Sequence, residues 1–341
     1  MKALVVSLLL TLFANESISQ DSRWSPLNSG PYHVGFRTVR LNSKAGNPMI
    51  ISIWYPSQSI TEALTLGDLI RMHPEESNVQ DSVLFTEFVA PIKWMFGQEM
   101  NYETCMRLID IPTRSYRDAK PMPGRFPLVI ALSEPPTYFA TFEFLATHGY
   151  VVAGLQCNFN TDSPPPPLHY TRYTDVMEEL LNYMEQQDNV KKKSISVFGH
   201  GFGINPALYL AMRTPRIRRA INVDGGFFGP RSNTTKSNDY QPDRLTIPLL
   251  HIITTSQQKE DDVNQFKALT NPITRVIIRP VVFKHQDISV WGRLVTLGLR
   301  AKEEIAVVNN VYVELHSIML DFLKDKSQSN AFPDLQIEKF N

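Results

Sequence analysis

The residues around positions 194–212 have the types and spacing that point most directly to chemistry. The pentapeptide at 199–203 reads Gly-His-Gly-Phe-Gly, and it lies between an apolar strand-like stretch, 194–198, and a helix-like stretch, 206–212. A strand, the motif Gly-x-Ser-x-Gly and a helix are typical of a nucleophile elbow, a sharp turn that presents a serine hydroxyl. Here glycine stands at the central position, Gly201. The sequence therefore predicts an elbow whose nucleophile position is vacant.

A carboxylate and a histidine follow later strand-like stretches, in the chain order nucleophile, acid, histidine. Asp224 comes directly after residues 217–223, and His285 follows residues 275–283. In a catalytic triad the carboxylate fixes the tautomer of the imidazole, and the imidazole accepts the proton of the nucleophile. We predict Asp224 and His285 as the acid and base facing position 201. Asp287 is an alternative partner for His285.

Neighbouring residues have other interpretations. His200 is expected to pack and hydrogen-bond within the elbow, and His251, inside an apolar strand-like run, is expected in the core. Ser133 is the nearest candidate for a displaced nucleophile, although it would have to reach His285 from a different loop. A phosphate-binding glycine loop at 199–203 is disfavoured, because no suitably placed Lys-Ser/Thr pair or ribose-binding acid follows.

Strand-like and helix-like stretches alternate along the chain from residue 126 onward. Apolar, β-branched runs predict strands, and apolar residues at helical spacing predict helices. Strands that alternate with helices are typical of βαβ units in a mainly parallel sheet. We predict one α/β domain with helices on both faces of the sheet. The predicted strands are 35–41, 49–55, 126–132, 150–155, 194–198, 217–223, 247–254 and 275–283, and the predicted helices are 139–148, 173–187, 206–212, 259–269, a stretch from 287, and 302–323.

The N-terminus predicts a signal peptide at residues 1–19. Lys2 supplies a positive charge, residues 3–14 form a mostly apolar run too short to span a bilayer comfortably, and residues 17–19 offer small side chains for cleavage. We expect a secreted or periplasmic mature chain, with an uncleaved membrane anchor as the alternative. No later stretch is long and apolar enough to predict a transmembrane helix.

The rest of the chain reads as one domain, from residue 20 to 326. The segment from about 57 to 125 is irregular and contains several prolines, so we predict an insertion or lid over the core in place of a separate domain. The tail at 327–341 is polar and expected to be loosely held.

Composition limits the partners. Lys plus Arg and Asp plus Glu are each 34, and the zero net charge predicts no attraction to nucleic acid or to an anionic membrane. Cys105 and Cys157 are the two cysteines, and an oxidising compartment permits a disulfide between them without requiring one. They have no suitably spaced histidines, so no zinc site is predicted. No metal or organic cofactor is implied.

Several further runs accompany the elbow and the residues around Asp224 and His285: they are 37–41, 53–57, 126–130 and 146–152. This ordered set resembles the platelet-activating-factor acetylhydrolase branch of the α/β-hydrolases and is also similar to dienelactone-hydrolase-like proteins. The resemblance implies an α/β-hydrolase fold and hydrolysis of a short acyl ester through a Ser-His-Asp triad. It places Phe202, Ser133 and Glu134 in the oxyanion-hole region.

Two departures from this family pattern weaken acyl transfer. Gly201 has no side chain to attack a carbonyl. The family usually has a His-Gly pair after the strand at 126–132, whereas this chain has Ser133-Glu134-Pro135-Pro136. Proline lacks an N–H, and Glu134 would place negative charge near a developing oxyanion. A residue with a side chain at the elbow position carries a backbone strain of about 1–3 kcal/mol, which glycine removes. Glycine at position 201 is therefore expected to increase stability at the expense of catalysis.

Three functional hypotheses follow. The preferred one is a pseudo-hydrolase that binds an ester, a lipid-like small molecule or a partner without acyl-enzyme turnover. The second is an active hydrolase or lyase in which His285 and Asp224 activate a water molecule. The third is a non-catalytic interaction module of a secreted complex, in which the former pocket is closed.

Overall fold

The computed structural model describes residues 24–44, 48–71, 81–132, 137–155, 167–228, 234–256, 258, 263–326 and 332–340. The predicted signal peptide, Cys157, and residues 133–136 lie outside these ranges.

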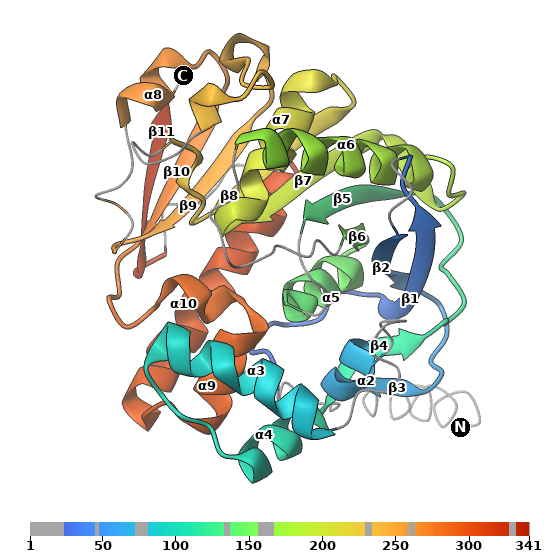
Figure 1. Cartoon of the computed structure of the whole chain (residues 1–341), viewed down its shortest axis with the longest axis vertical. Coiled ribbons are helices and arrows are strands. Elements are labelled where there is room, and N and C mark those ends of the chain that lie inside the picture. Colours follow the sequence, from blue (N-terminus) through green and yellow to red (C-terminus); the bar gives the residue numbers. More distant parts are fainter. Residues whose placement is uncertain are drawn as a thin grey trace, which may run out of the picture.

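An eleven-stranded sheet in the order β11-β10-β9-β8-β7-β5-β6-β2-β1-β4-β3 forms the centre of the molecule (Figure 1). The six neighbouring strands β10-β9-β8-β7-β5-β6 run parallel to one another. The prediction of a mainly parallel α/β sheet is confirmed. The parallel strands are β5 (Phe126–Leu132), β6 (Val151–Leu155), β7 (Val190–His200), β8 (Ile217–Val223), β9 (Leu249–Thr254) and β10 (Ile273–Ile278).

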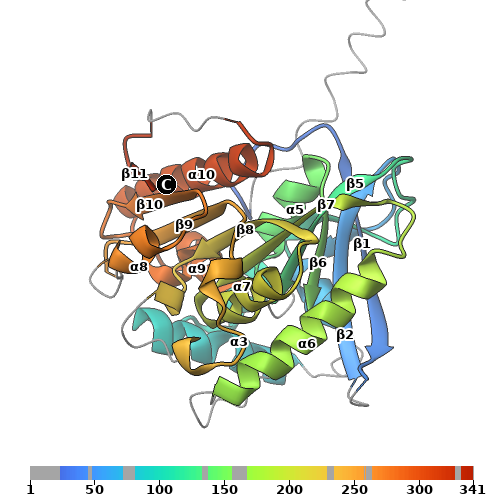
Figure 2. The same ribbon diagram turned by 90° about the horizontal axis from the view of Figure 1, so that it is seen from above.

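Helices cover both faces of the sheet, as Figure 2 shows. One apolar core lies under α6 (Pro167–Met184), α7 (Ile204–Arg213) and α8 (Val263–Ala268). The other lies under α5 (Phe139–Thr147), α9 (Val290–Gly298) and α10 (Lys302–Leu323). Because both faces are covered, the central strands need apolar residues without alternation, and every residue of β6 and β9 is buried.

The remaining strands extend the sheet at its other edge. β1 (His33–Asn42) and β2 (Pro48–Ser57) form an antiparallel pair, and β2 joins this pair to β6. β4 (Pro112–Arg117) runs parallel to β1, and β3 (Ala63–Thr65) pairs with β4.

The segment predicted as an insertion therefore contributes two strands to the sheet. It also contains α2 (Leu66–Arg71), α3 (Asp81–Phe96) and α4 (Tyr102–Ile109), whose described apolar side chains join the core under α9. A lid role for this segment stays a prediction.

Several boundaries differ from the sequence prediction, and two of them lie next to His285. β10 ends at Ile278 and not at 283, because Pro280 has no N–H for the ladder and the chain turns there, with Phe283 N donating to Pro280 O at 3.0 Å. The helix expected from 287 begins instead as a 3₁₀ turn, His285–Ile288, before α9.

The expectation of a loosely held tail is wrong for its last residues. β11 (Leu335–Phe340) pairs antiparallel with β10 along its whole length. The Arg275 guanidinium on β10 forms an ion pair with Glu338 on β11 at 2.8 Å. The free edge of β10 exposes backbone donors and acceptors, and the polar tail satisfies them by adding a strand.

Candidate active site

The elbow is formed where β7 ends and α7 begins. The chain passes from His200 through a 3₁₀ turn, Gly201–Gly203, into the helix. β7 lies next to β5, and the chain leaves β5 for β6 on the other side, so the elbow sits at the point where the strand order reverses. Open parallel sheets bind ligands outside the carboxyl ends of the strands at such a point.

The backbone favours glycine at positions 201 and 203 of the elbow. Gly201 has a φ of 55°, in the left-handed region that a side chain rarely adopts. A Cβ at Gly203 would lie 2.6 Å from the Leu132 carbonyl oxygen, so the helix start could not approach the end of β5 with a larger residue. The turn is therefore a tight elbow like that of a nucleophilic serine, formed by glycines.

The missing side chain at position 201 would point at a histidine. A Cβ built on Gly201 would lie 3.6 Å from His285 Nε2 and 3.7 Å from Cε1, in ordinary van der Waals contact. Beyond its two chain neighbours, no other described atom lies within 4 Å of that Cβ. Among the described residues, a small polar group at this position would contact only the imidazole.

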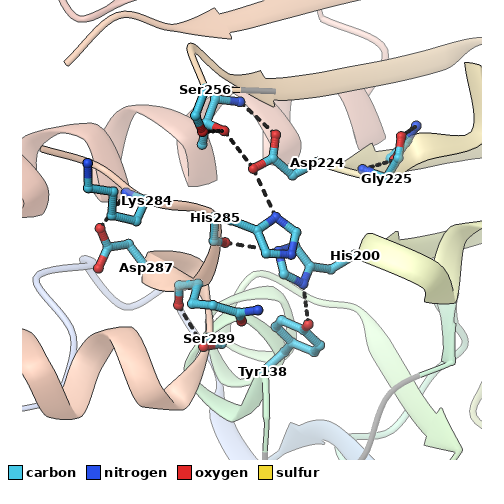
Figure 3. Close-up of polar contacts among 12 residues, drawn as sticks. Tyr138, His200, Asp224, Gly225, Ser256, Lys284, His285, Asp287 and Ser289 are labelled. Atoms are coloured by element: carbon cyan, nitrogen blue, oxygen red, sulfur yellow. Dashed lines mark hydrogen bonds and ion pairs between the residues drawn. The ribbon is translucent and has the colours of Figure 1, made fainter. Parts of the chain in front are cut away.

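Asp224 and His285, predicted as acid and base, lie within hydrogen-bond distance of each other. His285 Nδ1 lies 3.0 Å from Asp224 Oδ2 (Figure 3). Thr254 at the end of β9 holds the same carboxylate, with its N–H 2.7 Å from Oδ1 and its hydroxyl 2.8 Å from Oδ2. Asp224 itself has a φ of 48°, directly after β8. The ends of β8 and β9 and the loop after β10 therefore build one site.

The electrostatics of this pair favour a base at Nε2. Burial opposes ionisation of Asp224, but hydrogen bonds from His285 and Thr254 and the charge of His285 hold the pKa of that carboxyl below its usual range. A carboxylate can only accept, so His285 Nδ1 carries a proton. In the neutral imidazole, Nε2 then presents its lone pair toward Gly201. The side chain of His285 is 30% exposed, whereas that of Asp224 is 2% exposed.

Known proteins resemble this chain in sequence and in fold. The family model described as platelet-activating factor acetylhydrolase, isoform II, matches residues 169–336, which include Gly201, Asp224 and His285. A ferulic acid esterase from Streptomyces cinnamoneus superposes with a TM-score of 0.65 over 92% of this chain and 98% of its own, at 18% identity. The chain therefore has an α/β-hydrolase fold.

Two further comparisons carry no argument about the fold or the function. The AtxE2 isopeptidase, solved as an S527A variant with astexin3-dC4 bound, matches 88% of this chain and 42% of its own, with a TM-score of 0.48 and 14% identity. A search of curated proteins finds no match.

Asp224, and not Asp287, is the carboxylate that lies within hydrogen-bond distance of the His285 ring. Asp287 accepts hydrogen bonds from Lys284 N and from the Arg300 guanidinium, each at 2.7 Å. Burial raises the pKa of Asp287 to about 6, in spite of the Arg300 charge. Asp287 therefore holds the 3₁₀ turn that carries His285, and the alternative pairing considered from the sequence does not occur.

The oxyanion-hole region of this hydrolase fold is described only in part. Phe202 follows Gly201, and its side chain is 67% exposed beside the elbow. Ser133 and Glu134 lie outside the described residues, between the end of β5 at Leu132 and Thr137. The oxyanion role of these three residues stays a prediction.

Sequence reasoning missed residues that support the dyad. Thr254 donates twice to Asp224, and the signal was its place at the end of the strand next to β8. Asn222, fully buried on β8, accepts from Gly225 N at 3.0 Å and so holds the turn that carries Asp224. Its amide nitrogen lies 2.8 Å from Nδ1 of His251, which is buried in β9.

In the described part of the chain, no group of three or more His, Cys, Asp or Glu residues could hold a metal ion. Cys105 is a free, buried thiol, and burial raises its pKa to about 11.

Proposed function

We propose that this chain is a pseudo-hydrolase similar to the platelet-activating-factor acetylhydrolases, with the acid and base of a carboxylic ester hydrolase but no nucleophile. One observation carries the proposal: a Cβ at Gly201 would lie 3.6 Å from His285 Nε2, where the hydroxyl of a serine would be activated. The ligand we propose is an ester or lipid-like small molecule, bound without an acyl-enzyme.

The magnitude of the loss supports this view. Removing the serine of a triad lowers kcat by about 10⁶-fold, although about 10³- to 10⁴-fold catalysis over water can persist from binding and the oxyanion hole. Because glycine offers no nucleophilic atom, no covalent intermediate can form at position 201. Binding is the property of the site that survives this substitution.

A second candidate is direct hydrolysis by an activated water molecule. The free space facing Nε2 and the two hydrogen bonds from Thr254 to Asp224 favour it, because the base is oriented and accessible. His285 Nε2 would accept a proton from water as the hydroxide attacks the ester carbonyl, and would return that proton to the leaving alcohol. A lyase-type proton transfer would use the same base.

The third candidate, a pure interaction module with a closed pocket, has less support. It requires the old site to be filled, whereas the His285 side chain is 30% exposed and Phe202 beside the elbow is 67% exposed.

Hydrolysis of short-chain p-nitrophenyl esters tests these candidates in five purified proteins: native, His285→Ala, Gly201→Ser, Gly201→Ala and Gly201→Ser/His285→Ala. We expect activity only in Gly201→Ser, together with labelling by a fluorophosphonate probe. Gly201→Ala is the matched control, since it adds the same Cβ without a hydroxyl. Native hydrolysis that is lost in His285→Ala, without probe labelling, would instead establish the water mechanism.

We also propose that the mature chain is secreted or periplasmic. The support is the predicted signal peptide at residues 1–19. Across the described part of the chain, no helix combines the length and apolar character needed to cross a membrane. N-terminal sequencing of the protein from its native source would show cleavage after Ser19, or refute it.

A further inference from the structure

His200 lies against the base of the dyad, although the chemistry proposed above does not use it. Its ring stacks on that of His285, with centroids 4.1 Å apart and planes 24° from parallel (Figure 3). His200 is 8% exposed, so one face of the His285 ring is covered by a fixed, buried surface.

Hydrogen bonds fix the orientation and tautomer of His200. Its Nε2 lies 3.0 Å from the His285 carbonyl oxygen, which can only accept, so Nε2 carries the proton. The Tyr138 hydroxyl is hydrogen-bonded to Nδ1 on the other side of the ring and must donate to it. Flipping the His200 ring would break both bonds, so the ring has one orientation.

The charge state of His200 agrees with this arrangement. Burial and the charge of the neighbouring His285 lower the pKa of His200 to about 3. The ring therefore stays neutral, and keeps its donor and acceptor, throughout the neutral pH range.

We propose that His200 is a positioning residue for His285: its stacked ring and its hydrogen bond to the His285 carbonyl hold Nε2 toward position 201, and Tyr138 fixes the tautomer in which His200 can do so. The proposal rests on the proposed function, in which His285 is the base at that position. Orientation matters here because a misplacement of about 1 Å can cost about 10²-fold in rate.

Two substitutions separate the hydrogen bonds of His200 from its ring. His200→Gln offers an amide N–H for the carbonyl and an oxygen for Tyr138, but no ring. His200→Phe keeps a stacked ring and removes the hydrogen bonds that His200 makes to the His285 carbonyl and the Tyr138 hydroxyl. We expect His200→Gln to act as the conservative variant and His200→Phe as the disruptive one.

His316 provides a matched control. It is fully buried, and its Nδ1 donates to Tyr312 O at 2.7 Å while its Nε2 accepts from the Thr141 hydroxyl at 2.8 Å. Burial lowers its pKa to about 3 as well. His316→Gln therefore disturbs a similar buried imidazole between α10 and α5, and these two hydrogen bonds do not involve His285 or Asp224.

The first readout is the proton NMR signal of His285 Nδ1–H, hydrogen-bonded to Asp224, in the chain that keeps Gly201. We expect this signal in the native protein, His200→Gln and His316→Gln, and its loss or broadening in folded His200→Phe. A His200→Phe signal identical to the native one would overturn the proposal. If His200→Phe does not fold, Tyr138→Phe, which removes only the hydroxyl, must broaden the signal for the proposal to stand.

The second readout is ester hydrolysis in the Gly201→Ser background. We expect His200→Phe to lower kcat by about 10- to 100-fold with little change in KM, and His316→Gln to leave kcat unchanged. An unchanged kcat in His200→Phe would also contradict the proposal. If Gly201→Ser itself gains no activity, the proposed function fails, and the NMR signal of the native chain still decides the role of His200.

Discussion

At residue 201 the backbone has the shape of a nucleophile elbow, but glycine offers no nucleophilic atom. The backbone there has a φ of 55°, and the added Cβ would meet His285 at an ordinary contact distance and not in a clash. A side chain at this position would therefore cost backbone strain, while its direction would suit catalysis. Glycine relaxes the elbow, and under the proposed function it also leaves the nucleophile position vacant.

The strain at position 201 is measurable. We expect Gly201→Ala and Gly201→Ser each to lower the free energy of unfolding by about 1–3 kcal/mol, because a left-handed φ is unfavourable for residues with a Cβ. Urea denaturation gives the values. Gly226→Ala is the control, since Gly226 has no positive φ and no described atom would lie within 4 Å of its Cβ. If Gly201→Ala were as stable as the native chain, the elbow would not be strained by a side chain.

At the scale of elements, strand ends and edges decide where functional groups lie. Gly201, Asp224 and Thr254 each lie at or just after the carboxyl end of a parallel strand. Sheet pairing alone therefore brings them together at the carboxyl ends of the strands. At one lateral edge of the sheet, β11 pairs with β10, the strand that leads to His285. The C-terminal strand thus supports the element that delivers the base.

Deleting residues 335–341 tests this role. We expect a lower melting temperature and concentration-dependent association, because the freed edge of β10 exposes unpaired backbone groups. Size-exclusion chromatography and thermal unfolding measure both effects. Glu338→Gln is the matched control, since it removes the ion pair with Arg275 and keeps the strand. A truncated chain that stays monomeric and equally stable would contradict the prediction.

The whole molecule buries several titratable groups, and their pKa shifts have opposite signs. Burial lowers the pKa of His316 to about 3, below its unfolded value of about 6.5, so the unfolded state binds more protons between these pH values. The neutral His316 therefore contributes stability that is lost as the pH falls through this window. Asp287, with its pKa raised to about 6, contributes stability that is lost as the pH rises from about 4 to 6.

Denaturation of single variants across pH separates these contributions. We expect the destabilisation caused by His316→Gln to shrink by up to about 1.4 kcal/mol for each unit that the pH falls between about 6.5 and 3. For Asp287→Asn we expect the opposite trend, a destabilisation that shrinks as the pH rises from about 4 to 6. A pH-independent effect of both substitutions would show that neither group has a shifted pKa.

The sequence by itself determined the α/β class, most of the central strands and helices, and the positions of Asp224 and His285, because buried parallel strands need apolar runs and functional groups follow their ends. Tertiary structure decided the rest. Only the folded chain shows that Asp224 and not Asp287 pairs with His285, that Thr254 donates to Asp224 while His200 stacks on His285, and that the tail is a strand. These outcomes depend on contacts between residues far apart in the chain, and local patterns carry no record of such contacts.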